Sequence, residues 1–150
     1  MKYIFILLLS FPFGVFGQLK GKVVRIADGD TFTILVQEKQ YRIRLHGIDS
    51  PEKGQDFSVA AKQYLSDLIM HRMVEVKQKN KDRYGRIIGI ATIDGVNINE
   101  SLLRQGYAWH FTRYDRNPEW ALLEQTARAE RKGLWAQGNP LAPWEFRKSR

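Results

Sequence analysis

The 150-residue chain contains no cysteine. Disulfide bonds, thiolate metal sites, a cysteine nucleophile and a lipid anchor on cysteine are therefore excluded. Histidine is scarce, and His46, His71 and His110 have no spacing typical of a metal site or a nucleophile–base pair, so we interpret all three as structural. The chain also lacks internal repeats, low-complexity runs and linkers. Its length then predicts one domain with a single core.

The chain has no long hydrophobic run. Its most apolar stretch is a short one at the N-terminus. Residues 1–17 carry a single charge at Lys2 and an apolar stretch that is broken by Pro12. A comfortable membrane span needs about 18 or more apolar residues, and this run is shorter. The layout is typical of a secretory signal peptide with cleavage near Gly17-Gln18. We expect a secreted or periplasmic protein that touches a membrane only through its leader before cleavage; an uncleaved membrane anchor is the alternative.

Acidic residues are outnumbered by basic ones. The chain has 24 Lys and Arg against 16 Asp and Glu, which gives a net charge of +8. Lys2 is the only charged residue before Gln18, so the remainder carries +7. A surplus of this sign favours a polyanion or an anionic membrane surface as partner, and it says nothing about the fold.

The hydrophobic pattern predicts short strands and amphipathic helices. Alternation of apolar and polar residues predicts strands over 19–26, 31–36, 41–45, 74–77 and 87–93. Helical spacing predicts a helix over 57–69 capped near Asp56 or Ser58, a brief helix capped by Asn99, and a third helix opened by Asn117-Pro118. Five strands with a helix after the third and helices after the fifth predict an α+β fold, a five-stranded OB-fold β-barrel with about three helices. We expect the tail, 139–150, to be irregular and docked by Trp144.

Four acids fall near the ends of neighbouring predicted strands. Asp28 and Asp30 flank a glycine in a hairpin turn, and Asp49 and Glu52 flank a turn that Pro51 stiffens. Hard oxygen ligands without nearby Cys or His favour calcium or magnesium, and calcium suits an exported protein better. Asp-Gly-Asp alone is also an ordinary hairpin turn. Acids that face one another without a cation would repel, however, and this favours a metal site.

Arginines close to these acids could hold a phosphate. Arg44 precedes the Asp49 turn, and Arg86 follows a charged stretch farther along the chain. Two guanidinium forks can bind phosphate oxygens and bind more strongly as charge develops during attack on phosphorus. By alternation Arg42 is as good a candidate as Arg44, and arginines on an outward strand face are often only solvated.

A basic stripe with an aromatic residue in it suggests contact with nucleic acid. Such stripes neutralise phosphates, and Tyr84 could stack on a base or donate its phenol proton. The alternative is a solvated charged loop. The stripe consists of Lys77, Lys79, Lys81, Arg83 and Arg86.

Several motifs occur in the same order as in one known family. Over about residues 19–135 the chain resembles the thermonuclease, or staphylococcal-nuclease-like, family. The resemblance implies an OB barrel that hydrolyses DNA and RNA with calcium and leaves 3′-phosphates. The motifs are Asp28-Gly29-Asp30-Thr31, Arg44-Leu45 through Asp49-Ser50-Pro51-Glu52, Asp82-Arg83-Tyr84-Gly85-Arg86, Asn99-Glu100 with Arg104-Gln105-Gly106, and Gly133-Leu134-Trp135.

The resemblance also implies a set of calcium ligands. Asp30 and Asp49 correspond to direct ligands, with the backbone carbonyl of Ser50 as a third. Asp28 corresponds to an acid that reaches the ion through water. Ser50 stands where the best-known member has threonine, which matters little for a carbonyl ligand.

The same resemblance assigns the catalytic roles. It places Arg44, rather than Arg42, in the catalytic arginine position with Arg86 as its partner. Glu52 corresponds to the general base that activates the attacking water. The link that follows Glu52 is much shorter than in the best-known member of the family.

Substrate-binding residues follow from the same comparison. Arg83 and Tyr84 would hold a neighbouring phosphate. Thr112 stands where the best-known member has a second tyrosine, so base stacking would fall to Tyr114 with Trp109 or Phe111. We expect a monomer without a stable protein partner. The alternative function is a non-catalytic OB-fold module that binds nucleic acid, although such a module would be expected to lack the acids or the arginines.

Overall fold

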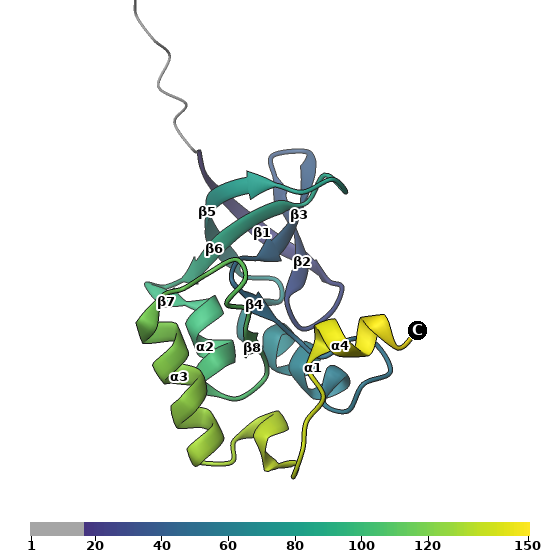
Figure 1. Ribbon diagram of the computed structural model, residues 1–150. Coiled ribbons are helices and arrows are strands. Elements are labelled where there is room, and N and C mark those ends of the chain that lie inside the picture. The colour runs from purple at the N-terminus through teal and green to yellow at the C-terminus, as the bar shows by residue number, and fades with distance from the viewer. Residues whose placement is uncertain (1–16) are drawn as a thin grey trace, which may run out of the picture.

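The computed structural model describes residues 17–150 (Figure 1). The expected signal peptide, 1–17, lies outside the described residues except for Gly17, so the fold does not address it. In the described part of the chain, no helix has the length and apolar character that crossing a membrane requires.

Five strands close into a barrel, which confirms the predicted α+β OB-fold architecture. Antiparallel pairings join β3, β2, β1, β5 and β6 in that order, and a parallel pairing of β3 with β6 closes the ring. In this closing pair Ile43 lies opposite Ile87, and Leu45 lies opposite Gly89. The barrel strands are β1 (Gln18–Ile26), β2 (Thr31–Val36), β3 (Lys39–Leu45), β5 (Met73–Lys81) and β6 (Ile87–Ile93).

One strand is longer than its alternation indicates. The pattern predicts a strand over 74–77 followed by a charged loop, whereas β5 continues to Lys81. A register shift between Gln78 and Asn80 keeps this polar extension paired with β6. Its side chains are mostly solvent-facing, so no hydrophobic periodicity marks it as a strand.

Three short strands extend this framework. β4 (Ile48–Asp49) pairs with β8 (Trp109–His110) in a separate two-stranded sheet, and β7 (Val96–Asn97) pairs with the end of β6. The β4–β8 pair ties the turn that carries Asp49 to a segment 60 residues farther along the chain.

The three predicted helices are α1 (Ser58–Ile69), α2 (Ile98–Arg104) and α3 (Pro118–Ala129). Asn117 caps α3 as predicted, because its side chain accepts a hydrogen bond from the backbone N–H of Glu119. The caps of the other two helices differ from the prediction. Phe57, in a left-handed conformation and without a side-chain cap bond, precedes α1, and Asn97 rather than Asn99 caps α2.

Asn99 instead has a structural role inside the protein. Its side chain is fully buried, accepts a hydrogen bond from the backbone N–H of Ala91 and donates one to the carbonyl of His46. It therefore joins β6 to the bend after β3, a role that the local sequence cannot reveal because His46 lies 53 residues away along the chain.

The main core fills the barrel and the space between the barrel and its helices, and a smaller separate cluster contains Ala127, Leu134 and Trp135. Full burial of a large aliphatic or aromatic side chain contributes about 1.5–3 kcal/mol, so this core dominates the stability. Its largest fully buried side chains include Phe32, Ile34, Ile43, Leu45, Leu65, Ile69, Ile98, Leu102 and Leu103.

The C-terminal tail is more ordered than the sequence indicates. A 3-10 helix at Gly133–Ala136 is followed by the six-residue helix α4 (Pro143–Lys148). Proline at its first turn and Glu145 near its N-terminus favour this helix, but six residues are too few for a helical periodicity. Trp144 docks the tail as expected, because its ring stacks on Phe111 with centroids 5.1 Å apart. In Figure 1 the tail turns back so that α4 lies beside α1 and the base of the barrel.

Candidate active site

The Asp-Gly-Asp turn between β1 and β2 lies against the turn after β4. Asp28 Oδ1 accepts a hydrogen bond from the backbone N–H of Asp30 at 3.1 Å. A Cβ atom built on Gly29 would lie 2.8 Å from the Cβ of Ala61 and 2.9 Å from Oγ of Ser50. Only glycine therefore lets this turn approach α1 and Ser50 so closely.

Asp30 connects three segments through its carboxylate. Its Oδ2 accepts a hydrogen bond from the backbone N–H of Ser50 at 2.7 Å, and its Oδ1 accepts one from Thr31 Oγ1 at 3.1 Å. Oδ1 also lies 3.2 Å from Nε of Arg44. This buried acid therefore joins β2, β3 and the turn after β4.

The acid cluster consists of Asp28, Asp30, Asp49 and Glu52. Arg44 lies between Asp30 and Asp49, with 15% of its side chain exposed. Its Nη1 donates to the carbonyl oxygens of Leu45 and Ile48 at 2.7 and 2.9 Å. Its Nη2 donates to Asp49 Oδ1 at 2.9 Å, while its Nε faces Asp30. The fork is thus fixed by two acids and by the backbone of the bend between β3 and β4.

The structure separates two arginines that alternation left equivalent. Arg42 is exposed, whereas Arg44 contacts the acids. The bend between β3 and β4 folds over the end of β3, so it covers position 44 and leaves position 42 in solvent. Strand periodicity cannot register such a cover, because it comes from the next segment of chain.

The acids are crowded together, and Asp30 and Asp49 are almost completely buried. Asp49 has only 2% of its side chain exposed, and burial raises its pKa above the ordinary 3.8, although hydrogen bonds from Arg147 oppose the shift. Burial, followed by the charge of Asp30, raises the pKa of Asp28 to about 7. Carboxylates placed in this way favour a nearby cation.

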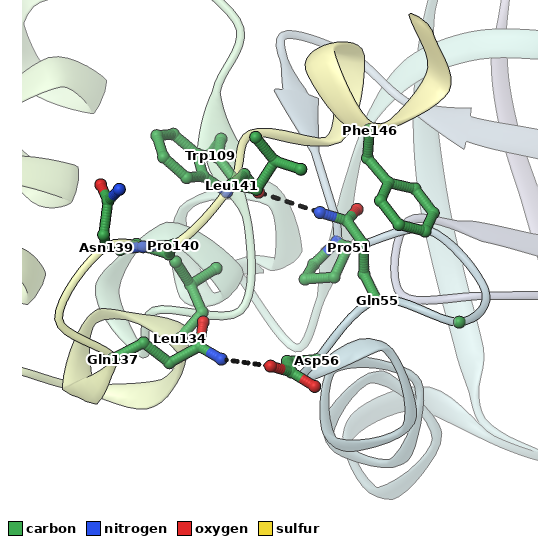
Figure 2. Close-up of a pocket in the computed structure, with 11 residues that line it drawn as sticks. Pro51, Gln55, Asp56, Trp109, Leu134, Gln137, Asn139, Pro140, Leu141 and Phe146 are labelled. Atoms are coloured by element: carbon green, nitrogen blue, oxygen red, sulfur yellow. Dashed lines mark hydrogen bonds between the residues drawn. The ribbon is translucent and has the colours of Figure 1, made fainter. Parts of the chain in front are cut away.

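Glu52 belongs to a compact turn that its short link closes. Its backbone N–H donates to Gln55 Oε1 at 2.8 Å, and the N–H of Gln55 donates back to the Glu52 carbonyl at 2.8 Å. Figure 2 shows Gln55 also donating to the carbonyl of Leu141, at 2.9 Å. The turn that presents Glu52 is therefore attached to the C-terminal tail.

Arg147 completes the cluster, and sequence reasoning missed it. From α4 its Nη2 lies 2.9 Å from Asp49 Oδ2, while its Nη1 lies 2.5 Å from Glu52 Oε1 and 3.3 Å from Asp49 Oδ1. It is separated from these acids by 98 and 95 residues along the chain. The tail has no periodicity, so no sequence signal could have brought Arg147 to this site.

Arg86 lies on the β5–β6 hairpin and is not joined to the acid cluster. Asp82 orders this hairpin by accepting hydrogen bonds from the backbone N–H groups of Tyr84 and Arg86, and from Nε of Arg86 at 2.7 Å. Within residues 17–150, no hydrogen bond or ion pair connects Arg86 to Asp30, Asp49 or Glu52.

Arg83 and Tyr84 form the exposed tip of the same hairpin. Arg83 Nη2 donates to the Tyr84 hydroxyl at 2.7 Å, and its guanidinium lies 4.9 Å from the centre of the ring. Tyr84 is 64% exposed. The tip therefore presents a cation and an aromatic face to solvent together, a combination that suits a phosphate and a base.

Tyr114 lies in an aromatic group that the tail partly covers. Its exposed ring meets Phe111 edge-on, with centroids 5.1 Å apart. Trp144 stacks on Phe111 and meets Trp109 edge-on. Of the three residues expected to stack on bases, Tyr114 presents the most accessible ring.

Two of the three histidines share one carboxylate. Nε2 of His46 and Nε2 of His110 lie 3.2 and 3.1 Å from the two oxygens of Asp115. Burial lowers the pKa of His46 below 6.5, although Asp115 opposes the shift. The three side chains join the bend after β3 to β8 and the loop after it, which agrees with a structural role.

The fold and the site define a class of protein. A five-stranded OB barrel carries an arginine between buried carboxylates, beside a basic hairpin and exposed aromatic rings. This combination of features is typical of a protein that acts on nucleic acid. Residues 42–137 match the family model described as "Staphylococcal nuclease homologue". The chain belongs to the staphylococcal nuclease family.

Named relatives agree with this assignment. An Escherichia coli protein called "Uncharacterized endonuclease" is 38% identical over 148 residues, which cover 97% of each chain. A Shigella flexneri protein called "Micrococcal nuclease" is 36% identical over 155 aligned residues, covering 96% of this chain and 88% of that one. A rice protein called "Probable staphylococcal-like nuclease CAN1" is 44% identical over 77% of this chain and 35% of its own length. These similarities support a nuclease enzyme.

Proposed function

We propose that this protein is an exported, calcium-dependent nuclease that hydrolyses phosphodiester bonds of DNA and RNA. The observation that carries the proposal is the fixed Arg44 fork between Asp30 and Asp49, with Glu52 at the adjoining turn. Such a site combines a guanidinium for phosphate oxygens with carboxylates for a hard cation.

The donor set suits calcium in both chemistry and charge. Asp30 and Asp49 would hold the ion directly with the Ser50 carbonyl, and Asp28 would reach it through water. No group of three or more His, Cys, Asp or Glu among residues 17–150 is arranged to hold a metal; the proposed set has only two directly bound carboxylates. Four acids against Arg44 and Arg147 leave two negative charges when all are ionised, and a divalent cation would neutralise them.

The chain's own groups would then perform the hydrolysis. When bound, calcium would supply positive charge for the phosphodiester oxygens. Glu52 would accept the proton of the attacking water. Arg44 would bind one equatorial phosphate oxygen. Arg86 would leave Asp82 and bind a second equatorial oxygen as negative charge develops. Cleavage of the bond to the 5′ oxygen leaves a 3′-phosphate.

Charge and stacking would hold the parts of the substrate that lie beside the cleaved bond. The +7 charge after Gly17 attracts a polyanion, so cleavage should slow as salt rises. Arg83 and Tyr84 would take a neighbouring phosphate, and Tyr114 would stack on a base. These contacts carry no base specificity, which suits an enzyme acting on both DNA and RNA.

The test is cleavage by purified Gln18–Arg150. Single-stranded DNA is incubated with calcium or with EDTA, and acid-soluble nucleotides are measured; we expect release with calcium and none with chelator. Added magnesium and pH 7 to 10 serve as further conditions. Binding without cleavage under every condition would leave a non-catalytic nucleic-acid-binding module instead.

Export is a separate part of the proposal. We propose cleavage of the leader near Gly17-Gln18 and release of a monomer outside the cytoplasm. Mass spectrometry of protein recovered outside the cytoplasm should find an N-terminus at or within a few residues of Gln18. Recovery of Met1 on that protein would contradict cleavage.

A further inference from the structure

Contacts from the C-terminal tail converge on the turn that carries Asp49 and Glu52. Arg147 contacts both carboxylates, and the Leu141 carbonyl accepts a hydrogen bond from Gln55. Nη2 of Arg150 donates to the carbonyl of Lys53 at 2.8 Å. Three separate tail residues therefore hold one seven-residue stretch, 49–55.

The Arg147 fork links the Asp49 carboxylate, which Arg44 also binds, to the carboxylate of Glu52. Its Nη1 contacts Asp49 Oδ1 and Glu52 Oε1, and its Nη2 contacts Asp49 Oδ2. Since one planar group binds both acids, neither can rotate without losing a charge-assisted hydrogen bond. Lysine could provide the charge but not this two-nitrogen geometry.

The tail does not reach this position through close packing alone. A cavity of about 270 Å³ lies beneath it, between the start of α1 and the segment before α4. Figure 2 shows side chains of Leu141, Phe146 and Gln55 around this space. Polar contacts to the turn and the stack of Trp144 on Phe111 therefore account for much of the tail's attachment. The polar contacts that join the tail to the turn also constrain the turn in return.

We infer that Arg147 is a positioning residue of the active site: it holds Glu52 and Asp49 in the arrangement that hydrolysis needs. The inference rests on the proposed function, in which these acids serve as general base and metal ligand. The link from Lys53 to Asp56 is short and exposed in part, and within residues 17–150 no side chain other than Arg147 bonds the Glu52 carboxylate. Arg147 supplies that support from 95 residues away.

Kinetics of three variants of Gln18–Arg150 test the inference. Arg147→Ala should lower kcat by about 10²-fold with KM within about threefold, since orientation rather than binding is lost. Arg147→Lys should recover only part of the turnover. Lys148→Ala removes the same charge from the same helix at an exposed position, so it should stay within about twofold of the wild type.

Chemical rescue separates positioning from general destabilisation. The Arg147 side chain is 43% exposed, so millimolar guanidinium ion can enter the space that Arg147→Ala leaves. We expect guanidinium to restore part of the turnover of Arg147→Ala and to leave the wild type and Lys148→Ala unchanged. A variant that was merely less stable would not be rescued, because millimolar guanidinium is far below denaturing concentrations and offers it no missing contact.

Hydrogen exchange gives a measurement that does not depend on catalysis. Amides of Ser50 and of residues 52–56 should exchange faster in Arg147→Ala than in wild type or Lys148→Ala, with and without calcium. Unchanged exchange would overturn the inference, as would normal turnover or increased turnover at limiting calcium, which would mean that Arg147 blocks the site. If the wild type fails to cleave at all, the proposed function fails, and exchange still decides whether Arg147 orders the turn.

Discussion

Replacement of Arg44 by lysine separates the fork geometry from the charge. A lysine at this position would keep a cation between Asp30 and Asp49, but one nitrogen cannot replace contacts made by three. At least two of the four partners would lose their donor. Hydrogen bonds to charged groups contribute about 1.5–3 kcal/mol each and those to carbonyls less, so Arg44→Lys should lower the free energy of unfolding by about 2–4 kcal/mol.

Turnover should fall further than stability alone explains. A preorganised donor to a developing oxyanion contributes about 10²- to 10³-fold in kcat, and we expect a loss of that size. The matched control is Arg42→Lys, an exposed arginine two residues earlier on β3, which should lose less than about 0.5 kcal/mol of stability. Both variants are assayed on single-stranded DNA with calcium, at a temperature where urea unfolding shows each more than about 99% folded. Equal losses in the two variants would refute the assignment of Arg44 to the site.

Three further predictions concern the base, the core and pH. Glu52→Gln should lower turnover by about 10²- to 10⁴-fold while calcium affinity changes far less, because Asp30 and Asp49 remain; near-normal turnover would transfer the base role elsewhere. Asn99→Ala should lower the free energy of unfolding by about 2–3 kcal/mol, since it leaves buried partners unpaired, whereas the cap variant Asn97→Ala should cost about 1 kcal/mol; the reverse order would contradict the burial argument. Burial depresses the pKa of His46 in the folded state, so the unfolded state binds its proton more readily, and the stability of wild type relative to His46→Gln should fall as pH drops below 6.5. Urea unfolding of both proteins at pH 8 and pH 5.5 measures this difference, and a pH-independent gap would show that His46 does not contribute.

Local sequence patterns were sufficient for most of the fold. Alternation located the barrel strands, and Asn117-Pro118 located the start of α3, because each signal and its cause lie within a few residues. The errors follow the same logic. Asn97 rather than Asn99 caps α2, because Asn99 is buried against His46, which is distant in sequence. β5 extends beyond its apolar residues because pairing with β6 stabilises a polar strand.

The site was predictable to the extent that its residues lie in short motifs. The acids and Arg44 come from two turns that the barrel topology brings together. The resemblance to a family had already assigned a role to each of these residues. Arg86 shows where this stops. Its motif predicts a phosphate contact, but in the structure the same motif provides Asp82, which holds its guanidinium on the hairpin. The catalytic role proposed for Arg86 would therefore require its guanidinium to leave Asp82, and no sequence pattern describes such a change.

Arg147 marks the remaining limit and connects it to function. The segment after Glu52 is short and cannot fold back over its own turn. It therefore cannot supply the guanidinium that bridges Asp49 and Glu52. Here the chain end performs this task, and α4 is fixed by Trp144 on an aromatic group far from the acids in sequence. Motif order predicts which groups would do the chemistry, whereas Arg147 in the tail links two of them, Asp49 and Glu52. In relatives with a longer link after the corresponding glutamate, we would therefore look for support from the link itself rather than from the C-terminus.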